Sequence, residues 1–217
     1  MRDAGPPDRR RVLSLRTSRM EALSDGIFAI ASTLLVLDLA VPAVQPDVAQ
    51  RLVDQWPIYL AYLVSFATIG QAWLGHSVIT EYLDRADSIL LRLNLVLLFF
   101  VSVLPFPTHM LAAYFSSTTA ERIAVTVYGL NLLAINGFTS VLWHYAVGEH
   151  LVSQDRSDAD LRALTSKLDP SLISYAVAIG IGLVLPKVAT ALYLLIALFV
   201  IIPFRAVARL VRRGTRS

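Results

Sequence analysis

The sequence predicts an all-α membrane protein with six transmembrane helices, from its composition, its six apolar segments and the distribution of its basic residues. Of the 217 residues, 56% are hydrophobic and 16% are charged, and the mean hydropathy is +0.62. Ordinary soluble domains have about 45–50% apolar and about 25% charged residues, so the excess apolar surface requires lipid. We expect residues 1–217 to form one transmembrane domain, since the spans leave no room for a soluble one.

Six segments approach the roughly 20 helical residues that cross a hydrocarbon core about 30 Å thick. They are 20–41, 57–80, 89–114, 121–146, 170–186 and 188–208. A basic tail, residues 1–16, precedes the first of them, and its "DRRRVLSL" is similar to a twin-arginine secretory signal. Acidic residues at 21, 25 and 38 interrupt the apolar run that a signal needs. We therefore expect the first span to be retained as a transmembrane helix.

Prolines and glycines mark two of the later spans. Pro105 and Pro107 predict a kink in the outer half of the third span, because proline removes a helical hydrogen bond. The fifth span is the shortest, and its Gly180 and Gly182 predict close packing on a neighbouring helix.

The longest loops are the outer segment 42–56 and the polar cytoplasmic segment 147–169. In the second of these, Leu161, Leu164 and Leu168 recur at helical spacing, which is compatible with a short surface helix. A solvated connector is the interpretation that we favour for this segment.

Lysine and arginine accumulate on the cytoplasmic side of membrane proteins, so their positions predict the orientation. With the N-terminus inside, sixteen of the nineteen basic residues are cytoplasmic. These are Arg2, Arg9, Arg10, Arg11, Arg16, Arg19, Arg85, Arg92, Arg156, Arg162, Lys167, Arg205, Arg209, Arg212, Arg213 and Arg216. Only Arg51, Arg122 and Lys187 lie outside. Both termini are therefore predicted to be cytoplasmic, and anionic lipid rather than nucleic acid is the expected partner of the basic flanks.

The chain lacks the motifs of cofactor-dependent enzymes and of carbonyl-filter potassium channels. There is no cysteine, no phosphate-binding glycine loop, no G-x-S-x-G or H-E-x-x-H motif, and no TVGYG filter. An intramembrane enzyme using His144, Glu149 and His150 is one hypothesis, but these residues cluster at a helix end without a nucleophile. We expect neither catalysis nor a cofactor.

The most informative polar residues lie at the start of the first span, in the triplet Ser24-Asp25-Gly26. Ser24 is either an N-cap with Asp25 in the first helical turn, or both residues lie within a helix that starts near Arg16 and are buried between helices. Trp73, His76 and Asn94, near the inner ends of the next two spans, are candidate hydrogen-bond donors for them. Taken alone, these residues leave both readings open.

The segment "RMEALSDG", residues 19–26, followed by "FAIASTLLVLDL", resembles the R-x-x-x-F-S-D first-helix signature of the lysosomal potassium channel family, transmembrane protein 175, and of its bacterial homologues. The six spans, "WLGH" at 73–76, and Asn94 before an apolar run ending in "PFPT" also resemble this family. One departure is that Leu23 replaces the usual phenylalanine.

The resemblance implies a homotetrameric, potassium-preferring cation channel in the bacterial plasma membrane, with the first helix of each subunit lining a central pore. Carried over by position, Ile30, Leu34 and Leu37 form a hydrophobic constriction and Thr33 a polar ring. Their i, i+4, i+7 spacing places the three aliphatic residues on one helical face, a pattern that ordinary helix packing also produces. Potassium would pass without a fixed cage of protein ligands.

The same resemblance assigns a supporting hydrogen-bond cluster to one set of residues. The set is Arg19, Ser24, Asp25, Trp73, His76 and Asn94. Asp38 lies near the outer mouth, where it either concentrates cations or simply faces water. The main alternative function is a proton-coupled secondary transporter with Asp25 and His76 as titrating groups, although the chain has no evident internal repeat.

Overall fold

The computed structural model describes residues 17–39, 48–115, 118–153 and 155–201. Nearly all regular structure in these ranges is helical, apart from an isolated bridge between Leu83 and Val152. The elements are α1 (Thr17–Leu34), the 3-10 turn η1 (Leu35–Asp38), α2 (Val48–Asp54), α3 (Trp56–Tyr82), α4 (Ser88–Val103), α5 (Pro105–Ala113), α6 (Thr118–Gly148), α7 (Asp158–Gly182) and α8 (Pro186–Ile201).

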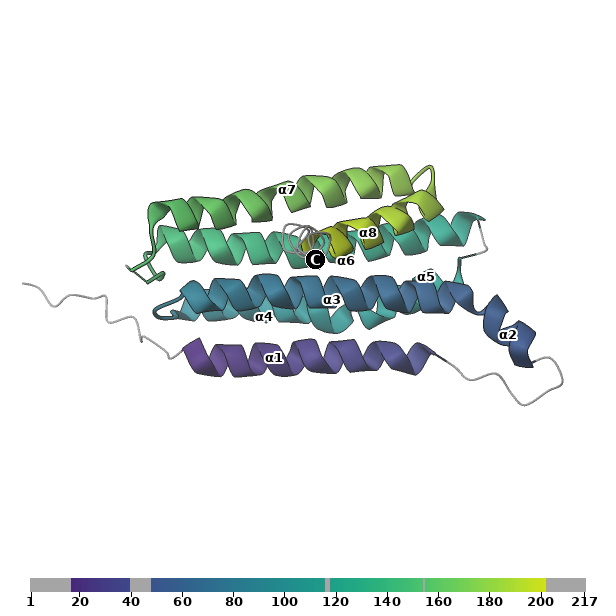
Figure 1. Cartoon of the computed structure of the whole chain (residues 1–217), viewed down its shortest axis with the longest axis horizontal. Coiled ribbons are helices and arrows are strands. Elements are labelled where there is room, and N and C mark those ends of the chain that lie inside the picture. The colour runs from purple at the N-terminus through teal and green to yellow at the C-terminus, as the bar shows by residue number, and fades with distance from the viewer. Residues whose placement is uncertain (1–16, 40–47, 116–117, 154, 202–217) are drawn as a thin grey trace, which may run out of the picture.

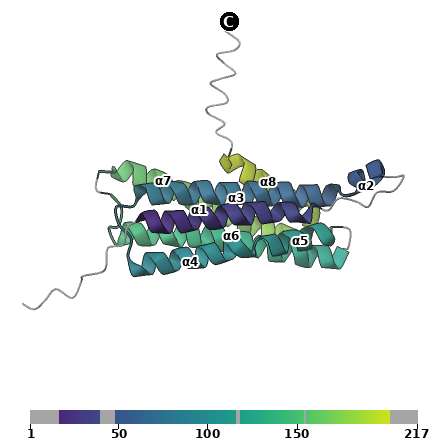
Figure 2. The same ribbon diagram turned by 90° about the horizontal axis from the view of Figure 1, so that it is seen from below.

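The long helices run side by side along one axis, and α1 lies at the flank of the bundle (Figure 1). It packs chiefly on α4 and α3, while α6, α7 and α8 form the opposite side. Figure 2 looks at the bundle from the α1 side and shows that no other helix covers α1 there. The chain direction alternates, so that α1, α4 and α7 begin at one end of the bundle and α3, α6 and α8 at the other.

Among the described residues, four helical stretches are long and apolar enough to cross a membrane: Thr17–Leu37, Trp56–Tyr82, Ser88–Ala113 and Thr119–Gly148. They coincide with the first four predicted spans. Two shorter apolar helices, Leu172–Gly182 and Pro186–Phe199, coincide with the fifth and sixth, and the end of the sixth predicted span lies outside the described residues. The molecule is thus a helical membrane protein, and the count of six spans stays a prediction.

The predicted interruption of the third span is confirmed. The helix ends at Val103 and resumes at Pro105, which stands in the first turn of α5. Thr108 restores bonding across the break, since its backbone N–H and its hydroxyl both donate to the carbonyl of Leu104, at 3.1 and 2.8 Å. The Leu104 carbonyl is therefore hydrogen-bonded despite the break in the helix.

The solvated connector predicted for 147–169 is wrong from Asp158 onward, because α7 runs unbroken from this residue to Gly182. Ser157 caps it, accepting a hydrogen bond from the backbone of Asp160 at 3.2 Å. Leu161 and Leu164 pack on a buried cluster around Trp143. This packing, rather than solvent, holds the first turns of α7.

The predicted close packing is confirmed at Gly182 and is wrong at Gly180. A Cβ at Gly182 would lie 3.0 Å from Val125 and 3.2 Å from Ala189, whereas one at Gly180 would meet nothing within 4 Å. Of the glycines that the structure describes, Gly129 on α6 is the tightest, since a Cβ there would overlap the Tyr193 hydroxyl of α8. Small residues let these backbones approach closely.

Candidate functional site: the uncovered face of α1 and its polar support

One side of α1 packs into the bundle and the other is uncovered in the protomer. Phe28 is 2% exposed and belongs to the main core cluster. Ile30, Leu34 and Leu37 are 59%, 43% and 74% exposed, respectively. Since the exposed residues recur at helical spacing, they form one apolar face, which we call the α1 face.

Small and polar groups interrupt the aliphatic residues of the α1 face. Thr33 is exposed beside Ile30, and its hydroxyl donates to the Ile30 carbonyl at 2.9 Å. Gly26 is exposed on this face toward the inner end of the helix, whereas Asp25 is exposed to one side of the face, next to Trp73 of α3. Asp38, at the outer end, has a side chain outside what the structure describes, so its predicted place at a pore mouth stays a prediction.

Asn94 on α4 joins α1 to α3 through a buried hydrogen-bond cluster. Its Nδ2 donates to the Ser24 hydroxyl at 3.0 Å, and its Oδ1 accepts from His76 Nε2 at 2.8 Å. Ser24, His76 and Asn94 are each at most 2% exposed. The Ser24 hydroxyl also donates to the Met20 carbonyl at 2.8 Å. Each polar group is thereby satisfied away from water, and the inner end of α1 is fixed to its two neighbours.

These contacts settle the two readings of the polar triplet. Because α1 begins at Thr17, Ser24 lies inside the helix and is buried, and the N-cap reading is wrong. Asp25 was expected to be buried with it, but it is exposed in the protomer and accepts a hydrogen bond from Trp73 Nε1 at 2.9 Å. The reason is angular, since the next helical residue points about 100° away from Ser24 and past the α4 contact.

Arg19 does not belong to the cluster. It is exposed, and within the described part of the chain it makes no hydrogen bond or ion pair to the other five predicted members. Asp25 and His76, paired in the transporter hypothesis, bind different partners, Trp73 and Asn94. The described contacts give no direct proton path between them.

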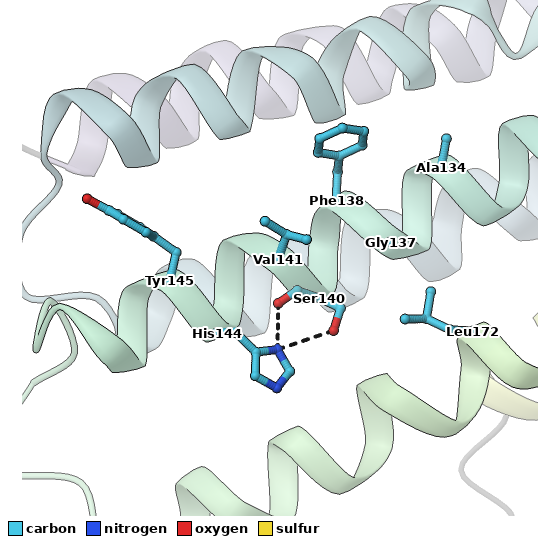
Figure 3. Close-up of a pocket in the computed structure, with 8 residues that line it drawn as sticks. All are labelled: Ala134, Gly137, Phe138, Ser140, Val141, His144, Tyr145 and Leu172. Carbon is cyan, nitrogen blue, oxygen red and sulfur yellow. Dashed lines mark hydrogen bonds between the residues drawn. The ribbon is translucent and has the colours of Figure 1, made fainter.

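The residues considered for an intramembrane enzyme lie elsewhere, on α6. His144 lines a pocket of about 590 Å³ between α6 and α7, and its Nδ1 lies 2.8 Å from the Ser140 carbonyl and 3.3 Å from the Ser140 hydroxyl (Figure 3). The other lining residues are largely apolar, and Glu149 and His150 are exposed at the end of the helix. Within the described ranges, no three His, Asp or Glu side chains are grouped to hold a metal ion.

Two further polar networks lie in the core, and neither was predicted from the sequence. Gln71 on α3 donates to Asn136 of α6 at 3.2 Å and accepts from the Tyr175 hydroxyl of α7 at 2.9 Å. Ser65 lies 2.7 Å from the Thr108 hydroxyl and 3.0 Å from that of Tyr128. The available signal was the presence of Gln and Asn inside apolar spans, where polar side chains need partners.

The fold and the site define the class of protein as a polytopic helical membrane protein with one flanking helix held by buried polar bonds. A family model described as "Endosomal/lysosomal potassium channel TMEM175" matches residues 19–105. This range contains α3, α4 and most of α1, the three helices that the Asn94 cluster joins.

Known proteins match most of the chain. It is 36% identical to a potassium channel of Streptomyces collinus, over 84% of this chain and 90% of that one. It is 39% identical to a potassium channel of Chamaesiphon minutus, over 76% and 84%. The crystal structure of a lysosomal potassium-selective channel TMEM175 homologue from Chamaesiphon minutus aligns with a TM-score of 0.73 at 34% identity, over 85% of this chain and 95% of that one. The chain belongs to the TMEM175 family, as a member of its bacterial branch.

Proposed function

We propose that this chain forms a potassium-preferring cation channel in the bacterial plasma membrane, a homotetramer in which the α1 face of each subunit lines a central pore. The observation that carries the proposal is the exposure of Ile30 and Leu37, at 59% and 74%, on the flanking helix. Membership of a family whose bacterial relatives are named potassium channels supports the choice of ion.

The composition of the α1 face favours other protein subunits over lipid as its covering. Lipid tails suit aliphatic side chains, but Gly26 and Thr33 share this exposed side of the helix with Ile30 and Leu34. Charged and polar groups in spans face a bundle interior or a water-filled cavity. Copies of α1 around an axis provide such a cavity.

A ring of aliphatic side chains explains how such a pore works without a carbonyl filter. Four copies of Ile30, Leu34 and Leu37 make narrow, dry rings, where a cation loses hydration without gaining oxygen ligands. Conduction then requires the rings to widen and wet. Thr33 supplies a hydroxyl between the rings formed by Ile30 and Leu34, and Asp38 is proposed as a ring of carboxylates at the outer mouth.

A single substitution tests the lining. Ile30→Asn places polar atoms in the proposed constriction, so it should raise potassium flux severalfold and reduce the preference for potassium over sodium. The measurement is potassium and sodium flux into proteoliposomes of the purified protein. Ile173→Asn on α7 is the matched control, because Ile173 is the same residue type and is also exposed, at 68%.

The control should conduct and select like the parent chain. If Ile30→Asn leaves flux unchanged while Ile173→Asn alters it, the lining belongs to another helix. Single-channel currents in a planar bilayer distinguish the channel from the transporter, because a carrier shows saturating exchange without unitary currents.

A further inference from the structure

A small pocket at the end of the bundle opposite the Asn94 cluster contains an unusual carboxylate. The pocket, about 290 Å³, lies between the first turn of α6 and the connection from α7 to α8. Glu121, Arg122 and Lys187 provide its polar side chains, and Val184, Leu185 and Val188 much of its apolar wall. Its size is at the lower limit of ligand pockets, about 300 Å³.

Glu121 is 4% exposed, and its Oε1 is buried without a hydrogen-bond partner among the described residues. Lys187 lines the same pocket but forms no ion pair with it in the part of the chain that the structure describes. An unpaired buried carboxylate is costly, and the helix N-terminus beside it offsets only part of this cost. The oxygen is shielded from water, and a donor in the pocket that Glu121 lines reaches it once the side chain turns toward that pocket.

Aromatic residues place this end of the bundle at the membrane–water interface. Trp56 packs edge-on against Phe115 with ring centroids 4.7 Å apart, and Tyr114 is 43% exposed nearby in sequence. Lys187 Nζ lies 5.4 Å from the Phe115 ring centroid. Tryptophan and tyrosine gather at the depth of lipid headgroups. A ligand that reaches the pocket from the membrane therefore presents its headgroup.

We propose that this pocket binds the ethanolamine phosphate headgroup of a phospholipid. The primary ammonium donates a hydrogen bond to Glu121, and the phosphate lies against Lys187 and Arg122. The acyl chains leave over Val184 and Leu185, which are 68% and 54% exposed. A choline headgroup has no N–H to donate, and a glycerol headgroup donates only from neutral hydroxyls, so neither gives the carboxylate a charge-assisted hydrogen bond.

The site is tested by thermal unfolding of the purified protein in detergent, with added phosphatidylethanolamine, phosphatidylcholine or phosphatidylglycerol. Phosphatidylethanolamine should raise the melting temperature more than the other two lipids, because a ligand that binds only the folded state stabilises it. Glu121→Gln should lower the affinity for this lipid by about tenfold, the usual effect of losing a charge-assisted hydrogen bond. Glu149→Gln, at an exposed carboxylate on the opposite end of α6, is the matched control and should keep the response.

Free phosphoethanolamine distinguishes the source of the headgroup. If it reproduces the shift and Glu121→Gln abolishes that shift, the site is supported and its ligand is soluble rather than a lipid. If Glu121→Gln does not fold, native mass spectrometry of the parent and of Lys187→Gln replaces it. The parent should retain phosphatidylethanolamine over phosphatidylcholine, and the Lys187 variant should retain less. An equal response to all three lipids, or a full response in Glu121→Gln, overturns the proposal.

Discussion

Among single residues, Asn94 makes the contacts that hold the first helix in place. Its amide group both donates to Ser24 and accepts from His76, so one side chain satisfies partners on two different helices. A carboxylate has no donor and a hydroxyl has a shorter reach, which makes an amide well suited to this position. The polar atoms lie on the buried side of α1, opposite the aliphatic α1 face.

Asn94→Ala should destabilise the protein more than Asp25→Ala. The first change removes the Asn94 partner of buried His76, at about 1–3 kcal/mol for an unsatisfied buried group, and leaves the Ser24 hydroxyl only its bond to the Met20 carbonyl. The second change removes one hydrogen bond between exposed side chains, Asp25 and Trp73, worth about 1 kcal/mol. Thermal melting of the two variants in the same detergent compares them. Equal losses, or a greater loss in Asp25→Ala, would show that Asp25 is the main support.

At the scale of elements, the sequence predicts lengths and shared faces better than it predicts neighbours. Apolar length located the first four spans, and Pro105 located the break in the third. The helical period also separates Phe28 from Ile30. The helical period does not show which side of the helix faces the core. Asp25 lies next to buried Ser24 yet is exposed, because the packing of α1 on α3 and α4 decides which side of α1 is buried.

The start of α7 shows the same limit in another form. Periodic leucines indicated a helix in 147–169, but their polar neighbours favoured a connector. The decisive contact is tertiary, since Trp143 Nε1 donates to the Thr165 hydroxyl at 2.8 Å, between helices that are consecutive but antiparallel. The sequence around Thr165 does not predict its contact with Trp143, which lies on the preceding helix. The Glu121 pocket was missed for a similar reason, because its walls come from α6 and from the α7–α8 connection.

The alternating helix directions predict which ends face the cytoplasm. The native chain has no cysteine, so Thr119→Cys near the start of α6 and Ser157→Cys before α7 each introduce a single exposed thiol. With the predominantly basic ends inside, an impermeant maleimide added to intact cells should label the first variant and spare the second. Lysed cells, in which both thiols should react, provide the accessibility control. The reverse labelling in intact cells would invert the topology and place the basic ends outside.

At the scale of the whole molecule, the protomer leaves one side of α1 uncovered. The core networks of Gln71 and Ser65 tie α3 to α5, α6 and α7, while α1 packs chiefly on α3 and α4. The protomer is therefore a packed helical bundle with α1 at its edge. The proposed pore forms only when the α1 faces of several protomers come together. Closed rotational symmetry is the usual way for identical chains to cover one such face.

The proposed tetramer predicts that the copies of η1 lie close to one another around the pore axis. Leu37 is 74% exposed at the outer end of the α1 face, so Leu37→Cys should place four thiols around one axis. A short bis-maleimide should then give a crosslinked dimer band on denaturing gels, since one thiol per chain joins chains only in pairs. Native mass spectrometry should give four times the 23.9 kDa chain mass. Ile173→Cys, equally open on α7 but distant from α1 in the bundle, should remain monomeric on the gel. Crosslinking of the Ile173 variant without crosslinking of the Leu37 variant would move the interface to α7, and the α1 face would then meet lipid.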